Sequence, residues 1–492
     1  MNRRRFKIHQ PLEGKGDGTV SRKSLSRKDR PALRMSNRSL VKRGNAVDVD
    51  VVIGGGGVAG AVTALALQQL GYQTLVVEPG LNDDRRLAGE LLHPPGVAGL
   101  AELGVLDALT RHPAIPVKGF CVLDADDPKQ IRLPYDAVRA HSTPGLSLEH
   151  KLIRQRLMQA AKDRPLVKFV ENARVTHVDQ SDRSHVTVQV TGPETATQYR
   201  CQFLVAADGA SSAIRRFAGI GVRNRRIATI FGYRVPISAL PDRDYGLVLI
   251  GGRTPVLIYP INESEARIMF DIPYDADRKP TSEDCLKLVA SLPSSVRREI
   301  EPVIATQPQM SAVIHEVAAQ QLTSGRVVLV GDAAVTCHPL TATGMTLCIT
   351  DALLLRDAIA DRRHDVRQAL ELHRQRRRWR QVTRLSLAET LRDVFCSGDE
   401  NLRIVRRGVL RYWRSSSGPP ASLALLSTAD GRLLALIREF ATVLMHSLVG
   451  ELSRWKQARK RQNWALGESL YGLASVLAHQ LRQIRGKCRL VS

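Results

Sequence analysis

The chain has few aromatic residues and none of the cysteine patterns that mark metal sites or disulfide frameworks. Phe, Trp and Tyr make up 4% of the 492 residues, and the seven cysteines are scattered, without a CxxC pair or a neighbouring histidine cluster. Thiols spaced in this way predict reduced cysteines, no bound metal ion and an intracellular protein.

Long apolar runs are also missing. No stretch reaches 18 consecutive apolar residues, so the sequence predicts no membrane-spanning helix. Within residues 422–452, however, seven apolar residues recur at helical spacing: Leu433, Leu434, Ile437, Phe440, Ala441, Leu444 and Leu448. Arg438 and Glu439 fall on the other side of this expected helix. The pattern suits either a helix packed on its own domain or a helix lying in a membrane surface.

Acidic residues are scarce, because 48 Asp and Glu stand against 72 Lys and Arg, a net charge of +24. Residues 1–46 are strongly basic and lack apolar periodicity, which predicts a basic, disordered extension. Further basic clusters lie at 373–381 and 454–462. No helix-turn-helix, zinc-finger or aromatic-interleaved pattern accompanies them, so we expect a peripheral membrane surface, and not nucleic acid, as the partner.

Residues 47–80 carry the pattern of a nucleotide-binding strand–helix–strand unit. An apolar strand is followed by Gly55, Gly57 and Gly60 in the spacing G-x-G-x-x-G, then by a helix and a second strand that ends at Glu78. The glycines allow a tight turn, close approach of a pyrophosphate and close helix–strand packing. The carboxylate of Glu78 would accept hydrogen bonds from ribose hydroxyls. This unit predicts a bound dinucleotide.

Two later segments favour FAD over NAD. Residues 203–216 predict a strand that ends at Asp208 and Gly209, with Arg215 at the start of a helix. A strand in 325–345 ends at Gly331 and Asp332, and a loop follows that opens a helix; its candidate flavin-contacting residues are Pro339, Gly344 and Met345. Asp332 can accept from a ribityl hydroxyl. Backbone N–H groups of the loop can stabilise negative charge on a flavin pyrimidine ring.

These three segments, in this order, resemble the para-hydroxybenzoate hydroxylase superfamily of FAD monooxygenases. Finer matches are similar to its squalene monooxygenase (squalene epoxidase) family. They are "RRLAGELLHPPGVAGLAELGVLDAL" at 85–109, "TPVLIYPINESEARIMFDIP" at 254–273 and "GDAAVTCHPLTATGMTLCITDALLLRDAI" at 331–359.

The resemblance implies FAD as cofactor and NAD(P)H as electron source, directly or through a flavin reductase partner. It implies that one oxygen atom of O2 passes from a flavin C4a-hydroperoxide to a lipophilic polyene or isoprenoid. Two alternatives stay open at this point. One is an FAD-dependent hydroxylase of an aromatic or polyketide-derived substrate, and the other is a non-oxygenase flavoprotein or lipid-binding protein.

The resemblance also implies positions for individual residues. Arg86 would lie by the FAD phosphates or ribityl chain, and His93 and Phe120 would line the flavin and substrate site. There the family carries a hydrogen-bonded Gln–Tyr pair, which His93 and Phe120 cannot reproduce. An arginine that the family places near FAD is replaced by Leu152, with His150 close by. The sequence offers no convincing acid–base triad.

We therefore expect an α/β fold in which a Rossmann-like FAD-binding domain, residues 47–370, is interleaved with a mixed β-sheet substrate domain at about 221–312. A helical C-terminal region, 371–492, would close the substrate cavity or lie on a membrane.

Overall fold

The structure is a computed structural model. It describes residues 42–43, 46–80, 90–111, 114–125, 127–251, 254–275, 281–362, 365–396, 398–458 and 466–490. Most of the basic extension expected at 1–46 lies outside the described residues. At its end the expectation of disorder is wrong, because Lys42–Arg43 and Ala46–Asp48 form strands β1 and β2 of a five-stranded sheet.

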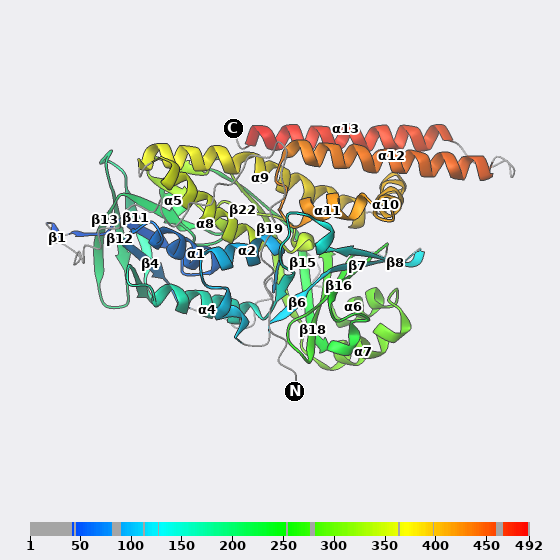
Figure 1. The fold of residues 1–492 in the computed structure, drawn as a ribbon, viewed down its shortest axis with the longest axis horizontal. Helices are drawn as coiled ribbons and strands as arrows, with labels where there is room; N and C mark the ends of the chain where they lie inside the picture. The colour runs from blue at the N-terminus through cyan, green and yellow to red at the C-terminus, as the bar shows by residue number, and fades with distance from the viewer. Residues whose placement is uncertain are drawn as a thin grey trace, which may run out of the picture. The chain divides into compact units, whose positions relative to one another are not determined.

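A six-stranded sheet forms the nucleotide-binding half of the fold (Figure 1). Its order is β10 (Val167–Glu171), β4 (Thr74–Glu78), β3 (Val51–Gly54), β14 (Phe203–Ala206), β21 (Val327–Leu329) and β20 (Thr323–Ser324). The first five strands are parallel, and they are almost entirely apolar because helices and a second sheet cover both faces. Helices α1 (Val58–Gln68) and α8 (Gly344–Asp361) lie side by side on one face. The second sheet, β1-β2-β13-β12-β11, is built from 42–48 and 174–201.

The expected substrate sheet is present and larger than predicted. Eight strands pair in the order β22 (Val335–Thr336), β19 (Met310–Ala319), β15 (Val222–Pro236), β18 (Glu265–Pro273), β17 (Val256–Pro260), β16 (Tyr245–Ile250), β7 (Gly119–Asp124) and β8 (Asp127–Pro134). The bounds 221–312 are therefore too narrow. They miss β7 and β8, because a parallel pairing of β7 with β16 joins segments more than 100 residues apart. Such pairing leaves no local sequence signal.

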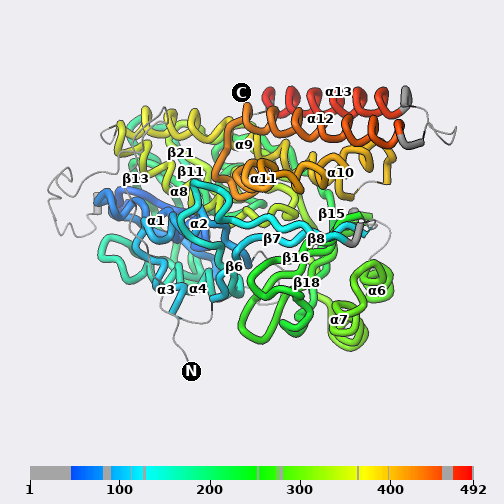
Figure 2. Tube along the Cα trace, turned by 45° about the vertical axis from the view of Figure 1, so that its right-hand side comes forward, coloured from blue at the N-terminus to red at the C-terminus, as the bar shows by residue number. Residues whose placement is uncertain are grey.

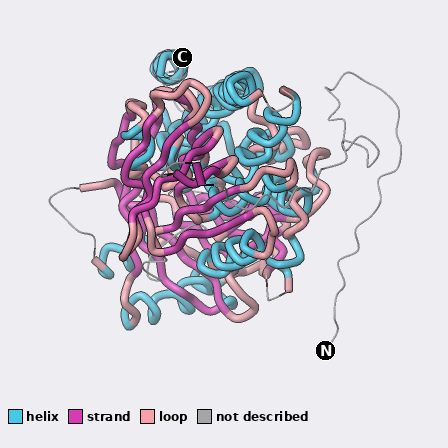
Figure 3. Tube along the Cα trace, turned by 90° about the vertical axis from the view of Figure 1, so that its left-hand side faces the viewer, coloured by secondary structure: helices cyan, strands magenta, loops and turns pink. Residues whose placement is uncertain are grey.

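Helices α6 (Ser282–Val289) and α7 (Ser294–Thr306) pack on the substrate sheet, and a short three-stranded sheet, β5 (Leu91–Leu92), β9 (Gly145–Ser147) and β6 (Ile115–Val117), lies beside it. Helices α2 (Pro94–Glu102) and α3 (Leu106–Thr110) connect β5 to β6, and α4 (His150–Lys162) connects β9 to β10. Figure 3, with strands in magenta and helices in cyan, shows helices lying against the strand layers.

The C-terminal region is helical, as expected, but it does not begin at residue 371. One helix, α9 (Val366–Cys396), crosses that boundary without interruption. It is followed by α10 (Glu400–Trp413), α11 (Gly418–Leu426), α12 (Leu433–Ala458) and α13 (Leu466–Leu490). Figures 1 and 2 both show α12 and α13 running side by side.

The basic cluster at 373–381 differs from the exposed patch that we expected. His373 and Arg377 are buried on α9, and Arg377 pairs with Asp351. Arg374 pairs with Glu371, and Arg376 pairs with Asp361. Much of this cluster is thus neutralised within the protein. The cluster at 454–462 begins in the last turns of α12, and residues 459–462 lie outside the described residues.

Helix α12 turns a different face to solvent than the sequence pattern suggested. Glu439 points inward, where its carboxylate accepts hydrogen bonds from Tyr412 Oη at 3.0 Å and from Ser422 Oγ. Leu434 is 76% exposed and Met445 is 59% exposed. By length and apolar composition alone, residues Leu433–Lys456 could cross a membrane, and they are the one such helix among the described residues. Length and composition do not test whether this helix crosses a membrane, so the absence of a spanning helix stays a prediction.

Candidate functional site

The residues expected to bind the cofactor gather at one edge of the six-stranded sheet. Gly54 pairs with Val77 and Ala206, and Ala206 pairs with Leu329, so β3, β4, β14 and β21 all end at the same level. The chain leaves this edge at the glycine turn, at Glu78, at Asp208 and at Gly331. Ligands of open parallel sheets bind at this carboxyl edge.

The glycine turn has the geometry that a pyrophosphate needs. Gly55 has φ +99°, and a Cβ there would lie 2.4 Å from the carbonyl oxygen of Ala207. A Cβ on Gly60 would lie 1.8 Å from the carbonyl oxygen of Gly55. Gly57, in contrast, faces open space and begins α1 without a side-chain cap. The first N–H groups of α1 are therefore available to an anion.

Glu78 is held at the end of β4 by two partners. Its carboxylate accepts from the backbone N–H of Gly56 at 2.5 Å and from Arg154 Nη2 at 3.0 Å. Arg154 lies on α4, one helical turn from His150. The sequence comparison with Leu152 missed it, because the arginine stands two residues further along the chain. Arg154 contributes positive charge to the nucleotide end of the site.

Asp208 and Arg215 organise the next loop instead of presenting free side chains. The carboxylate of Asp208 accepts from Ser212 Oγ and from the backbone N–H groups of Ala213 and Ile214, and so caps helix α5 (Ala213–Phe217). Arg215 donates to the carbonyl oxygens of Ala333, at 2.7 Å, and Ala210. Gly209 has φ +81° and faces open space. These contacts fasten the loop to the turn at Gly331.

Asp332 follows the last parallel strand, in a 3-10 turn over Gly331–Ala333. Part of its surface is accessible to solvent, but many protein atoms surround its carboxyl group. The resulting desolvation, with a smaller contribution from the charge of Asp351, raises the pKa of this carboxyl group to about 6. Asp351 itself accepts from the Gly331 N–H at 3.1 Å and forms two 2.6 Å contacts with Arg377. A buried ion pair on α8 and α9 therefore fixes the turn that carries Asp332.

The expected flavin loop follows. It contains a 3-10 turn at Pro339–Thr341, and Ala342 adopts a left-handed conformation with φ +50°. Helix α8 starts at Gly344, which faces open space, and its N-terminus has no side-chain cap. Met345 is buried in the core. The loop thus has an uncapped helix N-terminus beside open space, and its contact with a flavin stays a prediction.

His93 is anchored against this loop. Its Nε2 lies 2.8 Å from the carbonyl oxygen of Thr341, so Nε2 carries the proton and donates it. Its Nδ1 accepts from Tyr135 Oη at 2.6 Å. Burial, the main cause, lowers the pKa of His93 to about 3. His93 is therefore a neutral, fully buried hydrogen-bonding link between the loop and Tyr135.

Tyr135 supplies to His93 the hydroxyl group that Phe120 lacks. Phe120 cannot donate a hydrogen bond, but it packs 6.0 Å from His93 and 6.0 Å from Tyr135, measured between ring centroids. Tyr135 begins the 3-10 turn Tyr135–Ala137 directly after β8, the strand that pairs with β7 and thus with the strand of Phe120. The hydroxyl is therefore supplied from just beyond the neighbouring strand, a placement that the pairing of β7 with β8 reveals.

On the far side of the loop, an apolar wall of the substrate sheet faces Pro339 and Leu340. The small cavity between them is lined by Ile230, Leu257, Met269, Phe270, Asp271, His338, Pro339 and Leu340. Its two polar side chains face each other, with His338 Nε2 lying 2.8 Å from Asp271 Oδ2. Tyr259 is 3% exposed and donates to Glu90, which also binds Arg267, so it is a core residue.

The described residues fit FAD at both ends. Open space at Gly57, Gly209 and Gly344 suits a long dinucleotide. So do the uncapped helix N-terminus at each end, the acidic side chain that ends β4 and the one that follows β21. Arg86 lies outside the described residues. Among the described residues no group of three or more His, Cys, Asp or Glu could hold a metal ion.

Comparison with known proteins identifies the class. The FAD binding domain family matches residues 48–383, about two thirds of the chain, so the chain belongs to that family. Among solved structures, that of the P. aeruginosa protein PqsL with 2-aminobenzoylacetate superposes with a TM-score of 0.62 at 21% identity, over 71% of this chain and 97% of PqsL. The p-nitrophenol 4-monooxygenase PnpA of Pseudomonas putida gives 0.61 at 20% identity, over 80% and 98%. These likenesses confirm the expected fold.

Curated relatives define the family more narrowly. Squalene epoxidase of Aspergillus fumigatus is 30% identical over 454 residues, which are 87% of this chain and 90% of that protein. Squalene monooxygenase of Mus musculus is 25% identical over 472 residues, 92% of this chain and 82% of that protein. The chain belongs to the squalene epoxidase family and is an FAD-dependent monooxygenase.

Proposed function

We propose that this enzyme transfers one oxygen atom of O2 to a double bond of a lipophilic isoprenoid polyene of the squalene type. The second oxygen atom leaves as water, and NAD(P)H supplies the two electrons, directly or through a flavin reductase. Bound FAD supplies the activation of O2 in this scheme. The chain's own residues bind and orient the cofactor and the substrate, and they exclude water from the site.

The apolar wall facing the flavin loop carries this proposal. Ile230, Leu257 and Met269 come from three adjacent strands of the substrate sheet and line one cavity with Leu340 of the loop. An apolar polyene needs such a surface, whereas a phenol needs a polar partner for its hydroxyl, because an unpaired buried hydroxyl is costly. The polar pair in this wall, His338 and Asp271, is already mutually engaged.

Two residues would hold the flavin end in place. Asp332 would accept from a ribityl hydroxyl, and the N–H groups at Gly344 would face the pyrimidine ring. His93 acts through the loop: it fixes the carbonyl group of Thr341 and so positions the turn that precedes α8. It does not need to exchange a proton for this task, since it stays neutral.

The test is oxygen transfer to squalene by the purified flavin-containing protein with NADPH and a flavin reductase. We expect a product that has gained one oxygen atom. The variant Asp332→Ala should lose flavin and activity, whereas Glu263→Ala, which removes an exposed carboxylate from a turn of the substrate domain, should retain both. Oxygenated phenols without any squalene product would move the enzyme to the aromatic hydroxylases and end the polyene proposal.

We also propose that α12 and α13 rest on a membrane surface. On α12, the residues Leu434, Ile437, Met445 and Val449 are exposed, and on α13 the exposed residues are Leu470, Tyr471, Leu477 and Leu481. An apolar surface of this kind over two adjacent helices supports membrane contact. Leu434→Glu combined with Tyr471→Glu should abolish flotation with lipid vesicles. Phe217→Glu, an equally apolar exposed position on α5, should not. Flotation of both variants alike would refute the contact.

A further inference from the structure

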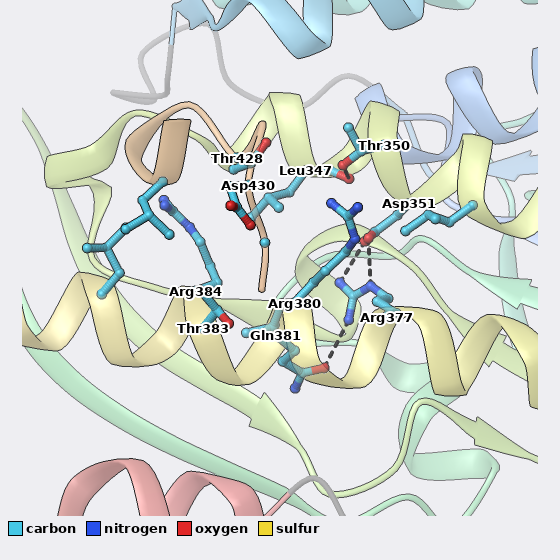
Figure 4. A pocket seen from close by; sticks show the side chains of 15 residues that line it. Leu347, Thr350, Asp351, Arg377, Arg380, Gln381, Thr383, Arg384, Thr428 and Asp430 are labelled. Carbon is cyan, nitrogen blue, oxygen red and sulfur yellow. Dashed lines mark hydrogen bonds and ion pairs between the residues drawn. The ribbon is translucent and has the colours of Figure 1, made fainter. Parts of the chain in front are cut away.

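A second cavity lies behind the flavin loop, between α8, α9 and the turn that follows α11 (Figure 4). Arg377, Arg380 and Arg384 line it from successive turns of α9, and Thr428 and Asp430 line it from the turn. Its volume is about 30 Å³. A single water needs roughly 10–15 Å³, so the cavity can hold one small polyatomic ion.

The charges that line this cavity do not balance. Asp351 is engaged by Arg377 through two 2.6 Å contacts. Asp430 is engaged by Arg432, whose Nη2 lies 2.7 Å from Oδ2. Arg380 also acts on Asp430, because its charge contributes to lowering the pKa of that carboxyl group. The two carboxylates of the cavity are therefore engaged by Arg377, Arg380 and Arg432, and Arg384 is the remaining arginine of the lining.

Arg384 is the arginine that these carboxylates leave without a counter-charge. It is 4% exposed, and no ion pair joins it to an acidic residue among the described residues. Nη2 donates to Thr341 Oγ1, while Nε and Nη1 are buried and have no acceptor in the described part of the chain. The hydroxyl of Thr428 is likewise buried without a hydrogen-bond partner. A guanidinium stays charged at all ordinary pH values, and a buried charge without a partner is unfavourable.

We propose that this cavity binds a small oxyanion group of the phosphate class, with Arg384 as its counter-charge and Thr428 as an additional donor. Guanidinium groups suit such anions because they are planar, permanently charged and rich in donors. The site lies outside the cofactor-binding edge of the sheet, and the proposal is independent of which substrate the enzyme oxidises.

The position of the site links it to the flavin loop. Arg384 contacts the side chain of Thr341, and the carbonyl oxygen of the same residue accepts from His93. An anion on Arg384 neutralises a positive charge that contacts the loop expected to face the flavin ring. Occupancy of the cavity therefore changes both the stability of the loop and the electrostatic potential at the flavin.

The experiment is a titration of the flavin-loaded protein with inorganic phosphate, with ionic strength held constant by gluconate, an anion too bulky for the cavity. We expect a saturable rise in melting temperature, since a ligand stabilises the state that binds it, and a saturable change in flavin absorbance. Arg384→Met should abolish both changes. Arg367→Met, which removes an exposed arginine from the same helix, should leave both unaltered.

Vesicles distinguish a free anion from a lipid headgroup. If anionic phospholipid vesicles produce the Arg384-dependent change and both inorganic phosphate and phosphatidylcholine vesicles do not, the oxyanion is a headgroup. The absence of a saturable change with any of these probes, or the same change in Arg384→Met, overturns the proposal. Should Arg384→Met fail to fold, Thr428→Val is the deciding variant. We expect the phosphate concentration at half-saturation to rise several-fold, and an unchanged concentration overturns the proposal.

Discussion

The two ends of the proposed cofactor site are built in different ways. The nucleotide end comes mainly from one continuous stretch, residues 51–78, in which strand, glycine turn, helix and Glu78 follow one another. The flavin end is assembled from separate segments that carry His93, Tyr135, Asp332 and Arg377. The first end depends on local backbone geometry, whereas the second depends on buried contacts between distant elements.

This difference predicts how each end fails. At the nucleotide end, the glycines lie so close to neighbouring backbone atoms that a single added methyl group is enough to disrupt the site. At the flavin end, the loss of one partner leaves a buried polar group unsatisfied, and the cost scales with the charge of that group.

The largest effect is expected for Gly60→Ala. The added Cβ would lie 1.8 Å from the Gly55 carbonyl oxygen, and neither backbone can move without breaking the turn. We expect no flavin in the purified protein and a loss of cooperative unfolding in calorimetry. Gly57→Ala is the matched control, because its Cβ meets no atom within 4 Å. It should fold normally but bind FAD more weakly, because the added Cβ occupies the space through which a pyrophosphate would approach the backbone. If the two variants unfold alike and retain the same amount of flavin, Gly60 is not needed for folding in a way that Gly57 is not.

Arg377→Met should cost about 3–5 kcal/mol of unfolding free energy, because it leaves Asp351 buried without a counter-charge. Both side chains of this pair are only 3% exposed. Urea denaturation measures the change. Arg376→Met provides the control on the same helix, because its pair with Asp361 is largely exposed and is worth under about 1 kcal/mol. Similar losses in both variants would mean that the buried pair does not support the Gly331 turn.

The sequence predicted the fold and the elements of the nucleotide end well, since these are local patterns. The strand, turn, helix and strand expected over 47–80 are present, and Asp208 and Asp332 follow parallel strands as expected. Arg154 was missed because its contact with Glu78 joins a helix and a strand 76 residues apart. No periodicity records such a contact.

At the predicted flavin end, the sequence located the loop after Gly331 but not the residues that support it. Phe120 suggested that a hydrogen-bonding partner was missing, and the pairing of β7 with β8 provides Tyr135 in its place. Asp351 and Arg377 were hidden for another reason. Arg377 sits in a run of basic residues that reads as an exposed face, and only the packing of α8 on α9 buries it.

A smaller effect is expected for Tyr135→Phe. The change removes the donor to His93 Nδ1 and leaves a buried acceptor unsatisfied, which costs about 1–3 kcal/mol. The ring packing with Phe120 is kept, so the loss reports the hydrogen bond itself. Thermal unfolding of the variant measures it, with Tyr471→Phe, whose ring is 79% exposed, as the control without effect. An unchanged melting temperature for Tyr135→Phe would show that the loop does not depend on His93.

The smallest effect concerns the pH dependence at Asp332. Burial and Asp351 raise the pKa of its carboxyl group to about 6 in the folded protein, above the usual value of 3.8. Between these values the folded state holds a proton that the unfolded state has lost, so the contribution of Asp332 to stability falls as pH rises from about 4 to about 6. In flavin-free protein, Asp332→Asn should therefore gain stability relative to the unmodified chain across this window and keep that gain at higher pH. Glu263→Gln, at an exposed position, should follow the unmodified chain. Parallel curves for Asp332→Asn and the unmodified protein would mean that the pKa of Asp332 is not raised in the folded protein, and that the carboxyl groups at the two ends do not differ in this respect.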